Sequence, residues 1–357
     1  MRVHGNRLPP KRRASLRRAA RCVAVVGCML MAAAPAARAH EAGAAAAPGE
    51  ARESMDVAAW IGRMRQAALE RNYSGTFVVL SAHGAMASYR IWHACEGQSQ
   101  IERVEALSGT PRIVFRRDGE VRTFLPQERI VRSEIRHAPG SFPGVPAASG
   151  AQPARHYAVR MGRPERVAGI DADTLDFVPR DAWRFGYRVW IDRASGLLMK
   201  MQTIDGDGRV LEQSAFSELT MGVPLGLQSI ARMMADVAGY RLVTVPTQPT
   251  TAQAEGWTLA ESVAGFAPQG CYRRHGLAPA EPARPVVQCI YSDGMATLSV
   301  FMEPYGVRRH PLTEQVASMG ATQVLAQKVS GDTWVTVVGE VPQRTLRYFM
   351  QTMRRGR

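Results

Sequence analysis

The sequence predicts an α+β protein in which antiparallel sheets dominate and which divides into a longer and a shorter domain. Short apolar and polar runs alternate at regular spacing through most of the chain, and turn residues separate them. A stretch with the composition of a linker divides these runs into two sets. Helical periodicity is confined to three segments, so the sequence favours sheets that carry a few packed helices.

The positive charge of the chain is concentrated at its N-terminus. The 357 residues have a formal net charge of +14, but the first 39 residues hold nine basic side chains and no acid, which leaves +5 on the rest. With 46% hydrophobic and 21% charged residues, the composition is that of a globular protein. The electrostatic case for nucleic-acid binding is therefore weak, and no nucleic-acid partner is expected.

Residues 1–39 have the three parts of a secretory signal peptide. A basic stretch runs to Arg21, an apolar stretch follows it, and the small-residue pattern Ala37-Arg38-Ala39 precedes His40. We expect cleavage between Ala39 and His40. The apolar stretch is shorter than the ~20 residues that cross a bilayer, and no later window would stop translocation. The mature chain is therefore expected to be exported and soluble, with a lipoprotein site at Cys28 or a twin-arginine signal as weaker alternatives.

The first domain is expected to span residues 54–243 and to open with an amphipathic helix. Helical spacing relates Val57, Trp60, Ile61, Met64 and Ala68. From Thr76 onward the period changes to that of strands joined by turns, which predicts an antiparallel meander. The expected strands are Thr76–Leu80, Ser88–His93, Gln100–Leu107, Arg112–Arg117, Val121–Leu125 and Arg129–Glu134.

The second half of this domain is expected to begin with a long loop. Residues 138–154 contain four prolines and three glycines, which is typical of loops. Strands then resume as a second meander over Tyr187–Asp192, Leu197–Asp205 and Val210–Leu219. A helix is expected next, because helical spacing returns at Leu227, Ile230, Ala231, Met234 and Ala238.

A linker is expected over residues 244–255, which contain two prolines and lack apolar periodicity. The second domain is expected over residues 256–357, with strands at Cys271–Arg274, Val286–Tyr291, Ala296–Met302 and Thr333–Gly339. Its last element is a helix opened by Pro342. We expect this helix to dock by one apolar side and to expose the other; the apolar side holds Leu346, Phe349, Met350 and Met353, and the basic remainder holds Arg344, Arg347, Arg354 and Arg355.

Three cysteines follow the predicted signal peptide. Cys271 and Cys289 are the favoured disulfide pair, because they would close a proline-rich loop between two strand-like segments in a compartment where disulfides persist. Cys95 is then expected to be a buried free thiol.

No catalytic or cofactor motif occurs after residue 39, and no enzyme activity, metal or cofactor is expected. Asp205-Gly206-Asp207-Gly208 imitates the start of a calcium loop but lacks the later bidentate acid, so we interpret it as a hairpin turn. His93 and Cys95 could supply two metal ligands. Since no second cluster lies nearby in the sequence, an ordinary strand end is the preferred interpretation.

Large apolar residues are expected on both faces of the first sheet. Tyr89 and Ile91 share one face of their strand, whereas Trp92 points the other way. Helices and a second layer are the usual cover, and an apolar ligand inside a curled sheet is the functional alternative. If a ligand cavity is present, the residues that we expect to line it are Phe77, Tyr89, Ile91, Phe115 and Val189.

Several runs of residues are shared with a known family. In the first domain they include residues 72–78 (NYSGTFV), 90–93 (RIWH), 109–112 (GTPR) and 179–192 (PRDAWRFGYRVWID), and in the second 291–294 (YSDG) and 335–342 (VTVVGEVP). These runs resemble the RseB/MucB family, periplasmic negative regulators of the envelope-stress sigma factor σE. The resemblance covers nearly the whole chain after the signal peptide, in the same order.

The resemblance implies a fold and a function. The fold is an unclosed antiparallel half-barrel like that of the lipoprotein carrier LolA, followed by a smaller α+β domain. The first domain would sense lipid, and the second would bind the periplasmic part of a membrane-anchored anti-sigma factor (RseA/MucA). Binding would shield that factor from proteolysis, and lipopolysaccharide or lipoprotein acyl chains would release it. A homodimer is compatible with this reading.

Candidate partner contacts are Tyr291 and Asp293 of the YSDG run and the basic pair Arg308 and Arg309, which would attract an acidic or amphipathic segment. Two other functions remain open. A lipid or lipoprotein carrier of the LolA type would need the same half-barrel. An envelope hydrolase has only scattered His and Asp residues in its favour.

Overall fold

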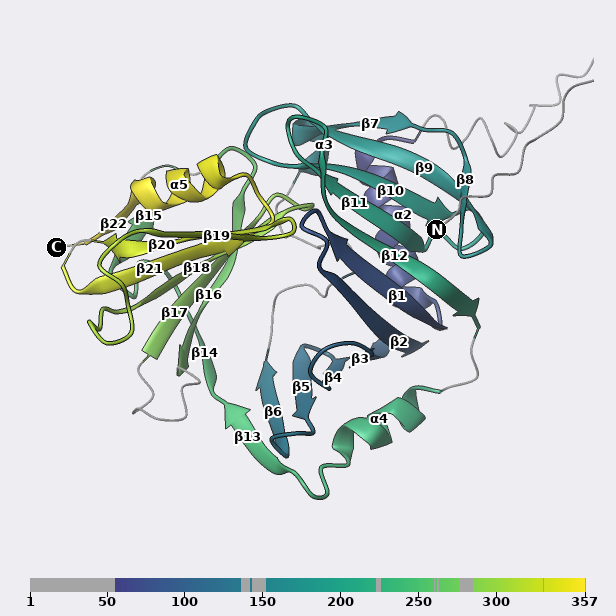
Figure 1. Ribbon diagram of the computed structural model, residues 1–357, viewed down its shortest axis with the longest axis horizontal. Helices are drawn as coiled ribbons and strands as arrows, with labels where there is room; N and C mark the ends of the chain where they lie inside the picture. Colours follow the sequence, from purple (N-terminus) through teal and green to yellow (C-terminus); the bar gives the residue numbers. More distant parts are fainter. Residues whose placement is uncertain are drawn as a thin grey trace, which may run out of the picture. The chain divides into compact units, whose positions relative to one another are not determined.

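The computed structural model describes residues 55–135, 142, 152–222, 226–259, 261, 263–275, 285–329 and 331–356. Their strands form one sheet of thirteen strands, one of seven and one of two (Figure 1). The predicted signal peptide lies outside the described residues. None of the described helices has the length and apolar character that a bilayer crossing requires.

The first sheet consists of two mainly antiparallel meanders joined through the β1–β12 pair, and it does not close on itself. Its strand order is β13-β6-β5-β4-β3-β2-β1-β12-β11-β10-β9-β7, with β8 paired to β9, and only the β13–β6 pair is parallel. Because β7 and β13 end this order without pairing with each other, the sheet is the unclosed half-barrel that was predicted. Its strands are β1 (Tyr73–Ser81), β2 (Met86–Glu96), β3 (Ser99–Ala106), β4 (Ile113–Arg117), β5 (Glu120–Leu125), β6 (Ile130–Ile135), β7 (Tyr157–Met161), β8 (Glu165–Val167), β9 (Ile170–Pro179), β10 (Gly186–Asp192), β11 (Leu198–Ile204), β12 (Val210–Met221) and β13 (Arg241–Val245).

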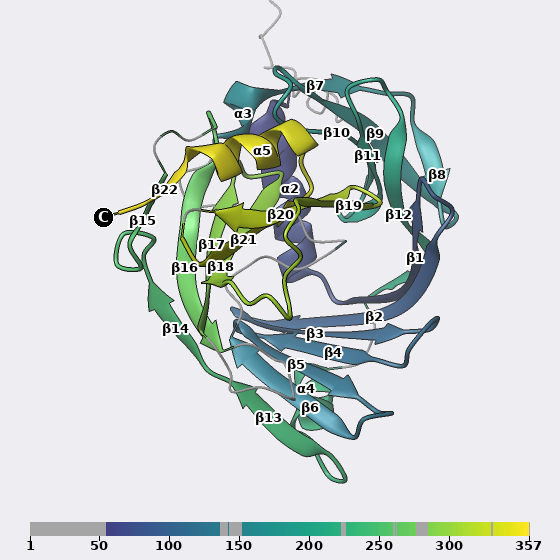
Figure 2. The same ribbon diagram turned by 60° about the vertical axis from the view of Figure 1, so that its left-hand side comes forward.

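Helix α2 (Val57–Glu70) packs inside the curve of this sheet, as Figure 2 shows. The Asp56 carboxylate caps the helix by accepting a hydrogen bond from the Ala59 amide at 2.8 Å. The apolar side of the helix buries Trp60, Ile61 and Met64 in one cluster with residues of the surrounding strands. The helix and its buried side are those that the spacing predicted.

Helix α4 (Leu227–Ala235) covers the opposite face of strands β2 to β5. Ile91 belongs to the cluster around α2, whereas the adjacent Trp92 packs against the cluster that contains Leu227 and Ile230 of α4. Successive residues of a strand point to opposite faces, so the two helices lie on opposite sides of the sheet. Over these strands both faces are therefore covered by helices, the more usual of the two arrangements considered.

The second sheet has the order β14-β16-β17-β18-β21-β20-β19, and helix α5 (Gln343–Thr352) packs on it through Leu346, Phe349 and Met350. A short helix, α3 (Pro153–His156), precedes β7 of the first sheet. The strands of the second part are β14 (Thr247–Thr250), β16 (Ala267–His275), β17 (Pro285–Ser292), β18 (Thr297–Pro304), β19 (Gln315–Met319), β20 (Thr322–Val329) and β21 (Thr333–Gly339), and β15 (Trp257–Leu259) pairs with β22 (Met353–Arg355).

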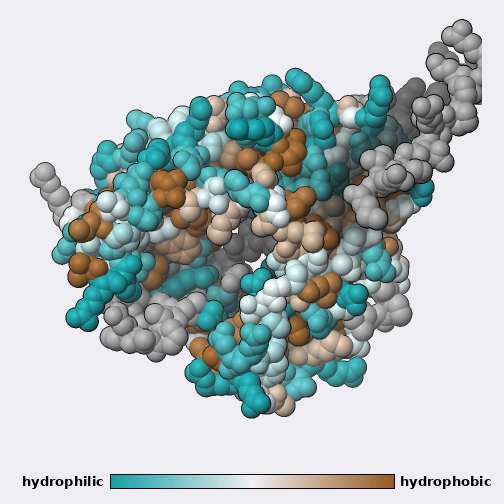
Figure 3. Space-filling model, in the orientation of Figure 1, coloured by the Kyte–Doolittle hydropathy of each residue, from teal (hydrophilic) through white to brown (hydrophobic). Residues whose placement is uncertain are grey.

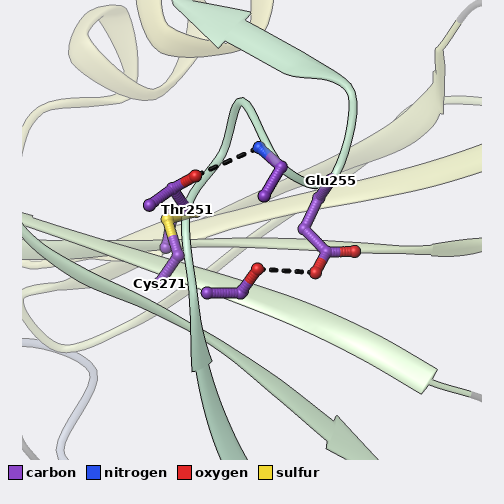
Figure 4. Close-up of a disulfide and its surroundings, with 6 residues drawn as sticks. Thr251, Glu255 and Cys271 are labelled. Carbon is purple, nitrogen blue, oxygen red and sulfur yellow. Dashed lines mark hydrogen bonds between the residues drawn. A yellow bond between two sulfur atoms is a disulfide. The ribbon is translucent and has the colours of Figure 1, made fainter.

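A disulfide joins Cys271 and Cys289, the pair favoured by the sequence. The two residues lie directly opposite each other on β16 and β17. Figure 4 shows the turn between Thr251 and Glu255 beside this bond, and the Thr251 hydroxyl accepts a hydrogen bond from the Ala254 amide at 3.0 Å. The disulfide thus connects neighbouring strands, and Cys271 also lies opposite Thr250, the last residue of β14.

Several strands were not predicted. Strand β9 was missed because Asp171, Asp173 and Asp176 interrupt its apolar residues, and β7 and β8 were missed with it. In the second sheet, β19 and β20 were missed. The two strands of the smallest sheet, β15 and β22, were missed as well. The final helix ends at Thr352, so Arg354 and Arg355 belong to β22 and not to the helix. The predicted loop is mostly outside the described residues, and its last part forms α3, in which Pro153 occupies the first turn.

Half of the predicted linker, residues 244–255, is in strands. Strand β13 pairs with β6 of the first sheet, and β14 pairs with β16 of the second, which leaves Pro246 between them. Strand β14 pairs with another strand on one side only. Pro249 has no backbone amide hydrogen to donate, but no strand on the open side needs that donor, so the proline is tolerated. Linker composition therefore marked parts of two edge strands and the turn that follows them.

Candidate functional site

Aromatic rings fill the inner side of the first sheet next to α2. Phe77 of β1 stacks on Tyr89 of β2, with ring centroids 5.2 Å apart, and lies edge-on to Phe216 of β12 at 6.1 Å. The ring of Phe142 packs against both Phe77 and Phe216, at 5.5 and 5.3 Å. All four belong to the buried cluster around α2 or pack against it. The interior where the sequence placed an apolar ligand is thus occupied by the protein's own rings.

Four of the five predicted cavity residues come together in this cluster. Ile91 and Val189 join Phe77 there, and Tyr89 packs against it. Phe115 is on the other face, in the cluster under α4, where its ring lies edge-on to Phe124 at 5.3 Å. The sequence could not show which strand parity faces inward, and Phe115 was therefore assigned to the wrong face.

A small polar pocket lies on the outer face of β1, β2 and β12. Strand β1 contributes only short side chains there, Ser74 and Thr76, and its neighbours contribute longer ones, including Arg90 and Glu218. The volume is about 220 Å³, and the full lining is Ser74, Gly75, Thr76, Arg90, Trp92, Glu218 and Thr220. This pocket faces away from the aromatic cluster, because Thr76 and Phe77 are consecutive residues of one strand.

Asp293 connects the two sheets and is not at the surface. Its carboxylate accepts a hydrogen bond from Nε of Arg184 at 2.8 Å, and both side chains are fully buried. Tyr157 of β7 donates its hydroxyl to the same oxygen, Oδ2, at 3.2 Å. The other oxygen, Oδ1, accepts the amides of Met295 and Ala296 at 2.9 and 2.7 Å. Both carboxylate oxygens therefore already have protein donors, and Asp293 is a structural contact between the sheets.

The loop that carries Arg184, between β9 and β10, makes further contacts to the second part of the chain. Arg184 donates to the Ala264 carbonyl at 2.6 Å and pairs with Asp181 of its own loop. The backbone carbonyl of Trp183 accepts the Thr345 hydroxyl of α5 at 2.6 Å. Burial and the charge of Asp293 raise the pKa of Tyr157 well above its ordinary value, so this tyrosine stays a hydrogen-bond donor at physiological pH.

The other predicted partner contacts divide into buried and exposed residues. Tyr291 is buried and packs against Phe349 of α5, with ring centroids 5.1 Å apart. Arg308 and Arg309 lie in the exposed segment between β18 and β19, where Arg309 is 3.6 Å from Glu303. Of the four predicted residues, only these two arginines have the exposure that a partner would need.

A pair of acidic residues forms a second junction between the sheets. Glu212 of β12 accepts a hydrogen bond from the amide of Ala321, in the turn between β19 and β20, at 3.4 Å. Burial raises the pKa of Glu212. Burial first, and then the charge of Glu212, raise the pKa of Glu340 from 4.5 to about 7. Glu340 follows β21, so at this junction the charge of Glu212 disfavours the ionisation of Glu340.

Sequence reasoning missed the residues that join the sheets. Arg184, Glu212 and Glu340 were not candidates, because nothing in one sequence shows which charged residues become buried. The available signal was the run from Asp181 to Gly186, where Arg184 sits between large aromatic residues. A cation in such surroundings is buried only with a partner.

The described side chains offer no evident metal centre. Within the described residues, no three His, Cys, Asp or Glu side chains gather as metal ligands would. His93 bonds to the Arg71 carbonyl at 2.8 Å and stacks on Tyr73, and the Cys95 thiol donates to Asn72 at 3.1 Å. Asp205 accepts the amides of Asp207 and Arg209, which makes this segment the predicted hairpin turn between β11 and β12.

Comparisons with known proteins agree with this architecture. The chain is 29% identical over 303 residues to the sigma factor AlgU regulatory protein MucB of Pseudomonas aeruginosa, which covers 83% of this chain and 90% of that protein. It is 26% identical over 297 residues to the sigma-E factor regulatory protein RseB of Escherichia coli K12, covering 82% and 89%. These relatives are named for regulation and not for a catalysed reaction.

Solved structures of MucB also match this chain. A crystal structure of MucB in complex with MucA(peri) matches with a TM-score of 0.63 at 27% identity, over 85% of this chain and 100% of that one. The Pseudomonas aeruginosa MucA/MucB complex also matches with a TM-score of 0.63, at 26% identity and over 84% and 98%.

Family models match both parts of the chain in order. The model of the MucB/RseB N-terminal domain matches residues 56–234 and that of the MucB/RseB C-terminal domain matches residues 251–354. The first match covers strands β1–β12 with α2 and most of α4, and the second covers strands β16–β21 with α5. The chain therefore belongs to the MucB/RseB family.

Proposed function

We propose that this protein is a periplasmic negative regulator of a σE-type sigma factor and that it acts by binding the exported part of a membrane-anchored anti-sigma factor. The observation that carries the proposal is the match of both family domains in order, together with the similarity to a relative solved with MucA. The N-terminal signal, with cleavage between Ala39 and His40, would deliver the chain to the compartment of that partner.

In this proposal the domain formed by residues 256–357 provides the main contact with the anti-sigma factor, and binding shields that factor from the protease that degrades it. Neither role requires chemistry by this chain, so we propose that it is not an enzyme. On the face seen in Figure 3, hydrophobic residues form separate patches among hydrophilic ones.

We further propose that the domain of residues 54–243 senses lipid. An acyl chain of lipopolysaccharide or of a lipoprotein would enter the aromatic cluster around Phe77 and replace the ring of Phe142, which packs there on Phe77 and Phe216. Such a ligand releases the partner only if it binds the free regulator more tightly than the complex. The two interactions are then thermodynamically opposed.

The test of partner binding uses residues 40–357 and the exported segment of the anti-sigma factor encoded in the same genome. Calorimetry should give a saturable complex, and the segment should be cleaved more slowly by its protease when the regulator is present. A segment that neither binds nor gains protection would overturn the proposed function. Light scattering of the free and bound chain reports whether either is a homodimer.

The test of lipid sensing compares Phe142→Ala with Phe124→Ala, which removes a similarly buried ring from the cluster under α4. Only Phe142→Ala should change the affinity for a short-chain lipopolysaccharide or a diacyl lipopeptide, because only that ring occupies the proposed site. Equal lipid affinities of the two variants and of the unchanged protein would remove the aromatic cluster as the lipid site.

A further inference from the structure

The exposed edges of the two large sheets are not equally protected. Each sheet has two end strands, β13 and β7 in the first and β14 and β19 in the second. An unpaired edge offers backbone groups to any other chain, and proteins usually block it with charged residues or proline. The end strands β7, β13 and β14 contain exposed Arg160, Arg241 and Pro249, respectively. Strand β19 contains neither a charged residue nor a proline.

Strand β19 is also apolar and open. All five of its residues, Gln315 to Met319, are exposed. Exposed large apolar side chains continue from the strand into the preceding segment; the exposed fractions are 44% for Val316, 66% for Met319, 75% for Val307 and 82% for Leu312. Such an edge is a hazard for aggregation unless another strand covers it in the working state of the protein.

The register shows which backbone groups are available. Strands β19 and β20 are joined by the two-residue turn Gly320-Ala321, with Met319 opposite Thr322. In such a hairpin the residues that flank the turn exchange backbone hydrogen bonds, and the pattern then alternates along the strand. The amides of Ala317 and Met319 therefore face β20, and those of Val316 and Ser318 face the open side.

Both ends of β19 are held in place. Just before the strand, Glu314 forms two hydrogen bonds with Arg347 of α5, at 2.9 and 3.0 Å. Just after it, the turn rests on Glu212 of the first sheet, so closely that a Cβ on Gly320 would lie 2.2 Å from the Glu212 carboxylate. An edge fixed at both ends loses little entropy when another strand pairs with it.

We propose that β19 pairs with an extended segment of the exported part of the anti-sigma factor, which joins the second sheet as an eighth strand. This inference rests on the proposed function and adds where and how the partner binds. The segment should alternate apolar residues, to contact Val316 on one side and Met319 on the other. It should be acidic at one end, because Arg308 is exposed in the segment that precedes β19 and makes no ion pair among the described residues.

A second copy of this chain is the less suitable occupant. Self-pairing of a five-residue strand would bury far less than the ~1,200 Å² that stable interfaces usually need. A longer extended segment can pair with β19 and continue across Val307 and Leu312, which gives it more contact than the strand alone provides.

The test compares Ser318→Pro with Ser318→Thr in residues 40–357. Proline removes the amide that faces the open side but none that bonds β20, whereas threonine keeps the amide and favours strands. We expect Ser318→Pro to weaken binding of the purified anti-sigma segment about tenfold or more, and Ser318→Thr to bind like the unchanged chain. Circular dichroism and thermal unfolding establish that both variants are folded.

Amide hydrogen exchange gives an independent reading on the unchanged chain. Binding should newly protect the amides of Val316 and Ser318, while Ala317, already bonded to β20, should change little.

Normal binding by Ser318→Pro, or no alternation in protection, would overturn the edge proposal and leave the proposed function standing. Failure of the unchanged chain to bind any anti-sigma segment would overturn both. A self-association that Ser318→Pro abolishes, with partner binding intact, would assign the edge to a second copy instead.

Discussion

Asp293 and Glu340 are acidic residues of the second domain that both lie beside the first sheet, but among the described residues only Asp293 has a basic partner. Asp293 pairs with the buried Arg184 and accepts three further hydrogen bonds. Glu340 instead has Glu212 as its charged neighbour, and its pKa rises to about 7. One junction therefore pairs opposite charges, whereas in the other burial and the charge of Glu212 disfavour the ionised form of Glu340. The difference predicts that the buried carboxyl of Glu340 makes the stability of the protein depend on pH.

The largest effect is expected from Arg184→Ala, which leaves Asp293 buried without its cation. Loss of one partner of a buried ion pair costs about 3–5 kcal/mol of unfolding free energy, because the remaining charge is uncompensated. Urea unfolding at pH 7.5 measures this loss. The matched control is Arg188→Ala, whose pair with Asp176 is partly exposed and should cost less than about 1 kcal/mol. Equal losses in the two variants would mean that Asp293 is not a fixed junction.

A smaller effect is expected from Gly320→Ala, which disturbs the junction at Glu212 without changing a charge. Gly320 has a φ of +62°, and the added Cβ would force the Glu212 carboxylate away from the Ala321 amide. Strain and the lost contact together should cost about 1–2 kcal/mol. Gly84→Ala provides the control, since its φ of +81° is also left-handed but nothing lies near its Cβ. The excess over this control measures the contact with Glu212.

Glu340→Gln should alter how stability depends on pH. The folded chain keeps the Glu340 proton up to about pH 7, whereas an unfolded chain loses it near the ordinary pKa of 4.5. Stability of the unchanged protein therefore falls as pH rises from 4.5 to 7 and is constant above that, as far as this group is concerned. The variant lacks this fall. Because Glu340 keeps part of its surface exposed, the gain at pH 8 should be about 1 kcal/mol. Thermal unfolding from pH 5 to 8 measures how the stability of the variant and of the unchanged protein depends on pH. Two stability curves that run parallel over this range would contradict the raised pKa of Glu340.

The smallest effect is expected from Glu212→Gln, which removes the neighbouring charge and keeps the hydrogen-bond acceptor. The pKa of Glu340 should fall from about 7 but stay above 4.5, because burial is the larger cause of its rise. NMR titration of the Glu340 carboxyl carbon measures the change. A return of the Glu340 pKa to its ordinary value would mean that the charge of Glu212 is the main cause of the rise. An unchanged pKa would mean that Glu212 does not influence Glu340.

The elements were predicted best where burial follows one simple period. Helix α2 and strands β1 to β6 follow from spacing and turn residues alone, because each has one side in an apolar cluster. Strand β9 was not recognised because its acidic residues hide the alternation, and β19 because it has no buried side. These strands are defined by their neighbours in the sheet, which a single sequence does not reveal.

The site was less predictable than the fold for the same reason. Alternation places Phe77, Tyr89 and Ile91 on a common surface, but it does not say which face of each strand is inside, so Phe115 was grouped with them. Asp293 was identified as noteworthy from its YSDG run, but its role depends on Arg184, which is 109 residues away in the sequence. Contacts over such separations are determined by how the two sheets meet.

The strand pairing on either side of Pro246 limits how the two sheets can turn. Val245 is paired with Glu134 in the first sheet and Thr247 with Arg274 in the second, and the guanidinium of Arg274 lies 3.4 Å from the Glu134 carboxylate. Pro246 has no ladder partner, and its ring fixes φ. While both ladders hold, a change of orientation along this connection is confined to the few backbone torsions on either side of Pro246, and the ring excludes φ of Pro246 from them. A twist of either sheet is therefore transmitted to the other through a connection only one residue long.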